Sequence, residues 1–255
     1  MRRLLLFCLL MTFLARPAAA EVPAALVTAI QARDGAAVEA LLAQDPRLVR
    51  QATLQGQTPL ILAAFGRERG GGFVRPEDNA AFAVLARRVI DPNPFEAVLL
   101  HDLKRVRAAL ARDPGLVKAA AANGWTLLHF AAYAGADDIA DLLIAKGARL
   151  DARAMGAFGV TPVQSALLVR RNALADHLLA VGADPWVRFS EGSSLLHEAG
   201  LLGDVEMVEM LGRRGANPMA RRDDGKTPRD IATARNHPEA AGKLEALEAA
   251  WKAAH

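Results

Sequence analysis

Residues 123–148 read NGWTLLHFAAYAGADDIADLLIAKGA. After the Asn-Gly turn, the hydroxyl of Thr126 can cap the first amides of a helix, and the apolar residues Ile139 and Leu143 lie at helical spacing in a second segment. Gly147 follows that segment, at a place where a glycine can end a helix in the left-handed conformation. The stretch therefore predicts a turn followed by two short helices.

The same pattern recurs along the chain at a nearly fixed period. It returns at 159–183 and 192–216 and, in degenerate form, at 225–247. The turn glycines lie 35, 33 and 33 residues apart: Gly124, Gly159, Gly192 and Gly225. A fixed period of this length is the signature of a repeat array in which each unit packs against its neighbours.

Three further units precede these. The segment GQTPLILAAFG at 56–66 matches GWTLLHFAAYAG at an offset of 68 residues, and 29–49 matches 97–117 at the same offset. Two neighbouring units therefore look duplicated in tandem.

Each unit also carries the same signals for the start and the end of its helices. Hydroxyl residues stand at the predicted helix starts, prolines follow them in several units, and glycines end the second segments. These residues are Thr126, Thr161, Ser194 and Thr227; Pro59, Pro162 and Pro228; Gly147, Gly182 and Gly215.

These residues resemble the ankyrin repeat, whose Thr-Pro-Leu-His start, two alanines, glycine, Leu-Leu and Gly-Ala are matched best by 123–151. The resemblance covers residues 22 to 250. It implies an all-α ankyrin-repeat solenoid of six to seven helix-turn-helix repeats with short β-hairpin-like turns. We expect one ankyrin-repeat domain over 21–255.

Some units depart from the family pattern. The first and third, around 24–50 and 95–118, lack the Thr-Pro start, and the last, at 225–250, looks like a polar capping repeat. The second carries an insertion, RERGGGFVRPEDN, at 67–79. The sequence leaves open whether this insertion is a plain loop or a finger that contacts a partner.

The first 20 residues have the pattern of a cleaved secretory signal. Arg2 and Arg3 precede an apolar run of about twelve residues, and small residues end at Ala20. The run is shorter than the roughly 20 residues needed to cross a bilayer, and Cys8 lacks the small preceding residues of a lipoprotein. We therefore expect residues 1–20 to be removed on export.

Removal of this segment changes the charge of the chain. The full chain has 31 basic and 28 acidic residues, and three arginines leave with the signal, so 28 of each remain. A formally neutral protein does not offer the basic surface that nucleic-acid binding requires. Cys8, the one cysteine, leaves as well, which excludes a disulfide framework or a thiol nucleophile.

The histidines His129 and His197 stand among apolar residues, three positions after Thr126 and Ser194. In an ankyrin-like unit, the resemblance implies that such a histidine bonds to the hydroxyl residue or to the backbone of an adjacent turn. The alternative is metal binding or general-base catalysis. We favour the structural role, because Gln164 holds the equivalent position between them.

No sequence motif indicates catalysis. The chain has no Gly-x-Ser-x-Gly, no phosphate-binding loop and no His-Glu-x-x-His. We therefore expect a protein that is not an enzyme and that holds neither a cofactor nor a metal ion.

The residues that stand out are large and apolar. Ankyrin repeats usually bind partners on a concave surface made by the turns and the exposed end of each first helix. Positions carried over from the family, or lying beside them in the turns, predict a partner-binding face of Trp125, Tyr133, Phe158, Leu168, Trp186, Phe189 and Leu201. Phe65 holds the matching helix position in the second unit, where it could instead fill a gap between repeats.

The expected function is recognition of a protein partner by a non-catalytic, monomeric module. The signal segment places it in the cell envelope, in a bacterial periplasm or secreted. Resemblance to exported bacterial ankyrin proteins suggests an inhibitor, an immunity protein or a factor in stress defence. The alternative is an envelope enzyme, or a metal or ligand carrier, built on the same scaffold.

Overall fold

The computed structural model describes residues 22–53, 57–65, 75–121, 123–154 and 159–254. Within these ranges the chain forms fourteen α-helices and four short 3-10 helices, with two isolated β-bridges and no β-strand. The predicted all-α repeat solenoid is confirmed. The predicted signal segment 1–20, the site residue Phe158 and the insertion up to residue 74 lie outside the described residues.

The α-helices form seven pairs, and we call the first helix of each pair inner and the second outer. The pairs are α1 (Ala24–Gln31) and α2 (Gly35–Gln44), α3 (Pro59–Ala64) and α4 (Ala80–Arg88), α5 (Pro94–Leu99) and α6 (Leu103–Arg112), α7 (Leu127–Ala134) and α8 (Asp137–Ala145), α9 (Pro162–Leu167) and α10 (Asn172–Ala180), α11 (Leu195–Leu202) and α12 (Val205–Arg213), and α13 (Pro228–Ala234) and α14 (Pro238–Ala254). The 3-10 helices are η1 (Pro46–Arg50), η2 (Pro76–Asp78), η3 (Pro114–Val117) and η4 (Ser190–Gly192).

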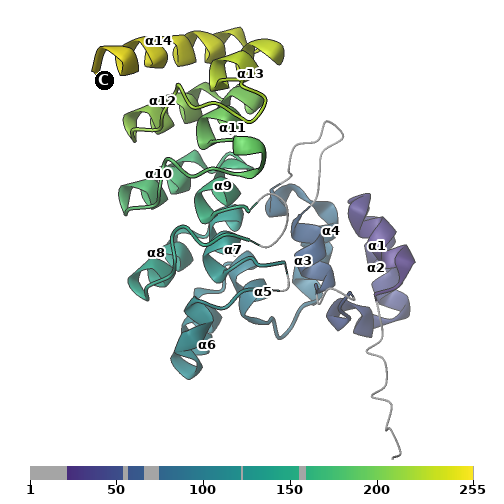
Figure 1. Cartoon of the computed structure of the whole chain (residues 1–255). Coiled ribbons are helices and arrows are strands. Elements are labelled where there is room, and N and C mark those ends of the chain that lie inside the picture. Colours follow the sequence, from purple (N-terminus) through teal and green to yellow (C-terminus); the bar gives the residue numbers. More distant parts are fainter. Residues whose placement is uncertain (1–21, 54–56, 66–74, 122, 155–158, 255) are drawn as a thin grey trace, which may run out of the picture.

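Figure 1 shows the pairs from α5–α6 to α13–α14 stacked one on another. The outer helices α6, α8, α10 and α12 lie along one edge of this stack, and the first two pairs lie on its opposite side, next to the inner helices. The first two repeats are therefore placed to contact repeats beyond their sequence neighbours.

Local sequence explains where the helices start. The hydroxyl of Thr161 accepts a hydrogen bond from the Gln164 amide at 3.4 Å, and that of Thr227 accepts one from the Asp230 amide at 3.2 Å. Proline follows each threonine at the first helical position, where the missing N–H costs no helical bond.

The outer helices of repeats 4 to 6 end in the same glycine motif. Gly147 has φ of 82°, its amide donates to the Ile144 carbonyl, and the next amide, of Ala148, donates to the Leu143 carbonyl, both at 2.9 Å. Gly182 and Gly215 end α10 and α12 with positive φ and the same pair of bonds. Glycine suits these positions because it enters the left-handed region without a Cβ penalty.

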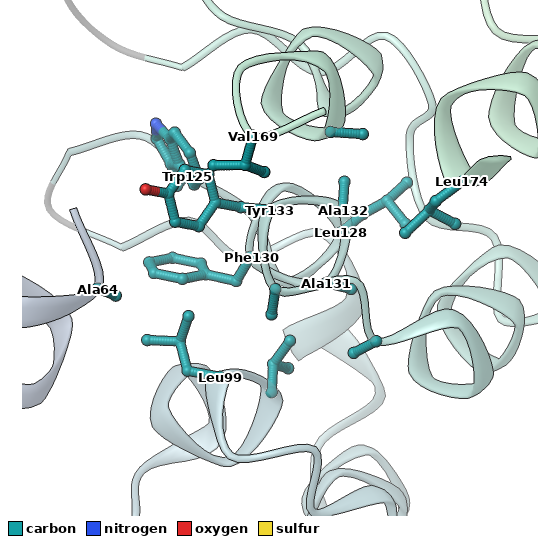
Figure 2. Packing of buried hydrophobic residues seen from close by; sticks show 14 of the residues in the cluster. Ala64, Leu99, Trp125, Leu128, Phe130, Ala131, Ala132, Tyr133, Val169 and Leu174 are labelled. Atoms are coloured by element: carbon teal, nitrogen blue, oxygen red, sulfur yellow. The ribbon is translucent and has the colours of Figure 1, made fainter. Parts of the chain in front are cut away.

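The core runs along the stack between the inner and outer helices. Figure 2 shows the part of it around α7, where Trp125, Phe130 and Tyr133 lie on one side of the helix, with Ala64 and Leu99 near Phe130. Phe130 and Tyr133 are fully buried, as are the paired alanines Ala131 and Ala132 of the repeat motif. Small residues at these two positions let neighbouring helices approach closely.

Candidate protein-interaction surface

The His129 ring ties one repeat to the next turn. Its Nδ1 accepts a hydrogen bond from the Thr126 amide at 3.1 Å and lies 2.9 Å from the Thr126 hydroxyl, while Nε2 lies 2.9 Å from the Val160 carbonyl. Because Nδ1 accepts from an amide, the proton of the neutral ring is on Nε2 and is donated to Val160. Burial lowers the pKa of His129 from 6.5 to about 4, so the ring is neutral at physiological pH.

His197 repeats this arrangement two units later. Its Nδ1 accepts from the Ser194 amide at 3.2 Å, and its Nε2 lies 3.0 Å from the Lys226 carbonyl. Burial again lowers the pKa of the ring. At the equivalent position of the unit between them, Gln164 leaves its buried Oε1 without a hydrogen-bond partner.

In both histidines, each ring nitrogen is hydrogen-bonded to another group of the protein and is not available to a ligand. Across the part of the chain that the structure describes, no group of three or more His, Cys, Asp or Glu side chains could hold a metal ion.

Two of the expected partner-binding residues lie in the interior instead. Trp125 is 8% exposed and Tyr133 is not exposed at all. Phe65, from the second repeat, covers them: its ring centroid lies 4.7 Å from that of Trp125 and 5.2 Å from that of Tyr133. The expectation that these two aromatic residues are exposed is therefore wrong, because another part of the same chain packs over them.

The remaining expected residues have different surroundings. Phe189 is also buried, at 8% exposure, whereas Trp186 is 52% exposed. Leu168 at the end of α9 and Leu201 in α11 are partly exposed, and neither belongs to the apolar core formed by the described residues. The structure thus leaves three of the six expected residues that it describes accessible.

One aromatic neighbour escaped the sequence analysis. Trp251, near the end of α14, lies edge-on to Trp186 with a centroid distance of 5.5 Å. The two residues are 65 positions apart in sequence and belong to different repeats. Only the extra length of the last helix, 17 residues against 9 or 10 in the other outer helices, could have signalled this contact.

The end of the insertion also contacts a distant repeat. The Arg75 guanidinium donates to the carbonyls of Val169 at 3.1 Å and Arg170 at 3.4 Å, in the turn between α9 and α10. Glu77 pairs with Arg171 in the same turn. Together with Phe65, these contacts place the second repeat against the inner-helix side of the fourth and fifth.

A half-buried acid lies beside the accessible leucine of α11. Glu198 precedes Leu201 by three residues, so the two share one side of the helix. Burial raises the pKa of the Glu198 carboxyl, and the charge of Arg222 opposes this shift. This part of the surface therefore combines an apolar group with a carboxyl group that is poorly solvated.

Comparison with known proteins agrees with this geometry. A model of three ankyrin repeats matches residues 95–189 and a single ankyrin-repeat model matches 191–223, together about half of the chain. The chain belongs to the ankyrin-repeat family. The structure adds two more helix pairs of the same kind before residue 95.

A curated relative shares part of this sequence. Tyrosine-protein kinase HTK16 of Hydra vulgaris is 35% identical over 118 residues, which make up 46% of this chain but 15% of the kinase. Because the match spans so little of that relative, the activity in its name is not transferred to this chain.

Ankyrin repeats are in general protein-interaction modules, which suggests a protein partner. Of the helices that the structure describes, none is both long enough and apolar enough to span a membrane.

Proposed function

We propose that this protein binds a protein partner through the inner helices of repeats 5 and 6. The observation that carries the proposal is the contrast between equivalent positions. Tyr133 in repeat 4 is sealed under Phe65, whereas its counterparts Leu168 and Leu201 are partly exposed and lie outside the core. Accessible apolar groups on a rigid scaffold are typical of contact surfaces.

The stacked helices favour such binding energetically. The inner helices α9 and α11 begin at the caps Thr161 and Ser194 and lie between repeats on either side, so little ordering is needed when a partner docks. Trp186, 52% exposed, would add a large apolar group of the kind that often dominates interface energies.

We further propose that the protein acts after export, as a monomer in the cell envelope. The basic start, the short apolar run and the alanines before Glu21 support removal of residues 1–20. A role as inhibitor, immunity protein or stress-defence factor in a bacterial periplasm agrees with export and recognition, and it rests on resemblance to exported bacterial ankyrin proteins.

The test is affinity capture from an envelope extract with residues 21–255 as bait. A Leu168→Arg, Leu201→Arg variant places two charges on the proposed face. A matched control, Ala108→Arg with Ala111→Arg, places the same charges on exposed positions of outer helix α6.

A partner that is held by the wild type and the control but lost by the variant supports the proposed face. Retention by all three proteins means that the face is wrong. If the wild type retains no protein, a small-ligand or enzymatic role replaces the proposal. Circular dichroism of each variant checks that the helices are intact.

A further inference from the structure

A second surface lies on the outer helices of the first two repeats, away from the inner-helix face. A groove of about 450 Å³ opens between the end of α2 with η1 and the end of α4. Leu42 and Val49 form its floor and are almost fully buried, whereas Ile90 stands at its edge with 81% of its surface exposed. We call this the outer groove.

Neighbouring residues fix the turn that holds Ile90 at the surface. Its carbonyl accepts a hydrogen bond from the Arg105 guanidinium at 3.1 Å, and Asp91 pairs with the same guanidinium at 3.1 Å. Arg105 belongs to α6, so the next repeat fixes the turn that presents Ile90. A single exposed apolar side chain is common on a monomer surface, but Ile90 lines the same groove as Leu42 and Val49, so the three residues form one apolar lining.

The rim of the outer groove is basic. It carries four exposed arginines: Arg47, Arg50, Arg87 and Arg88. Arg47 pairs with Asp45 and Arg88 with Glu39, but Arg50 and Arg87 form no ion pair with any described residue. None of the described residues that line the groove is acidic. The surface therefore offers an apolar floor beside two uncompensated guanidinium groups.

We propose that the outer groove binds an acidic segment of a protein partner. An apolar side chain of that segment packs on Leu42 and Val49 beside Ile90, and flanking carboxylates pair with Arg50 and Arg87. Guanidinium groups suit this role because their planar N–H donors match a carboxylate with two hydrogen bonds.

A membrane surface fits these observations less well than a peptide does. Each basic residue near an anionic bilayer adds only a small attraction, and stable attachment takes several of them or a broad apolar face. The outer groove provides two unpaired arginines and one exposed isoleucine, set in a hollow rather than on a flat face.

The probe is a display library of random peptides about twelve residues long, long enough to cover one groove of this kind. Residues 21–255 serve as bait, and peptides that also bind an Arg50→Glu, Arg87→Glu variant are removed. The expected peptides combine Asp or Glu with Leu, Ile, Val, Met or Phe. Their affinity for the wild type should fall at least about tenfold between about 50 and about 300 mM NaCl.

Two further variants complete the test. Ile90→Asp should also weaken these peptides by at least about tenfold, because it places a charge against the apolar floor. Arg107→Glu with Arg112→Glu, an equal charge change on exposed positions of α6, should leave their binding unchanged.

The proposal is overturned if no peptide depends on the outer groove, or if the enriched peptides lack acidic residues. It is also overturned if anionic phosphatidylglycerol vesicles, and no peptide, bind in a way that Arg50→Glu with Arg87→Glu abolishes. Since Leu168 and Leu201 are unchanged in these variants, failure here leaves the proposed inner-helix face untouched.

Discussion

The imidazole of His129 is a titratable group that the fold keeps neutral. Its Nδ1 accepts from the Thr126 amide, and burial lowers its pKa to about 4, whereas the unfolded chain titrates near 6.5. Between these values the unfolded state binds a proton that the folded state does not. The contribution to stability is therefore complete above pH 6.5 and is lost as pH falls toward 4.

We predict that a His129→Gln variant, which carries the residue found at position 164, is less stable than the wild type at pH 7 by about 1 to 3 kcal/mol. It should also lose less stability on acidification, because the group that takes up the proton on unfolding is gone. Urea unfolding at pH 7 and pH 5 measures both free energies. The two curves should converge at the lower pH, and parallel curves would show that His129 does not govern this dependence.

At the scale of elements, six of the seven helix pairs turn at one left-handed residue between their two helices, and the connection of the second pair includes residues outside the described ranges. Repeats 4 and 6 place Gly135 and Gly203 there, whereas repeats 1, 3, 5 and 7 place other residues at positive φ: Arg33, His101, Arg170 and Asn236. A side chain in this region pays a Cβ penalty of about 1 to 2 kcal/mol, which glycine avoids. The repeat architecture therefore requires a left-handed residue in this turn even where the residue is not glycine and the conformation is unfavourable.

We predict that His101→Gly stabilises the protein by about 0.5 to 1 kcal/mol, since the gain in the turn exceeds the larger entropy loss of glycine on folding. His101 is exposed and has φ of 55°, so little packing is lost. Gly135→Ala is the opposite change: its Cβ would lie 2.8 Å from the Arg171 guanidinium, and the variant should be destabilised. Urea midpoints measure both effects, and a neutral or lower midpoint for His101→Gly would contradict the prediction.

Local signals predicted the elements well because they act within one repeat. The threonine caps, the first-turn prolines and the glycines at 147, 182 and 215 depend on residues a few positions apart. The exposure of Trp125 could not be predicted in the same way. Its partner Phe65 comes from 60 residues earlier and from a repeat that is not its neighbour, and no periodic pattern encodes that approach.

At the scale of the whole molecule, this stack departs from a simple chain of neighbours. In an ordinary solenoid each repeat contacts only the next, and stability is a sum of adjacent terms. Here Phe65 of the second repeat packs on Trp125 and Tyr133 of the fourth, and Arg75 donates to the Val169 carbonyl of the fifth. These contacts bypass the third repeat and should couple the two halves of the protein.

We predict that Phe65→Ala lowers the free energy of unfolding by roughly 2 to 3 kcal/mol, because the aromatic cluster loses its cover. In a Trp186→Phe, Trp251→Phe background Trp125 is the only tryptophan, and excitation at wavelengths that Tyr133 does not absorb isolates its emission, which acrylamide should quench more strongly in the variant. Phe95→Ala is the control, since Phe95 meets Phe130 from the adjacent repeat, with a centroid distance of 5.4 Å. Quenching that rises in Phe65→Ala but not in Phe95→Ala would show that the second repeat covers Trp125. If quenching does not rise in Phe65→Ala, packing between adjacent repeats alone keeps Trp125 buried.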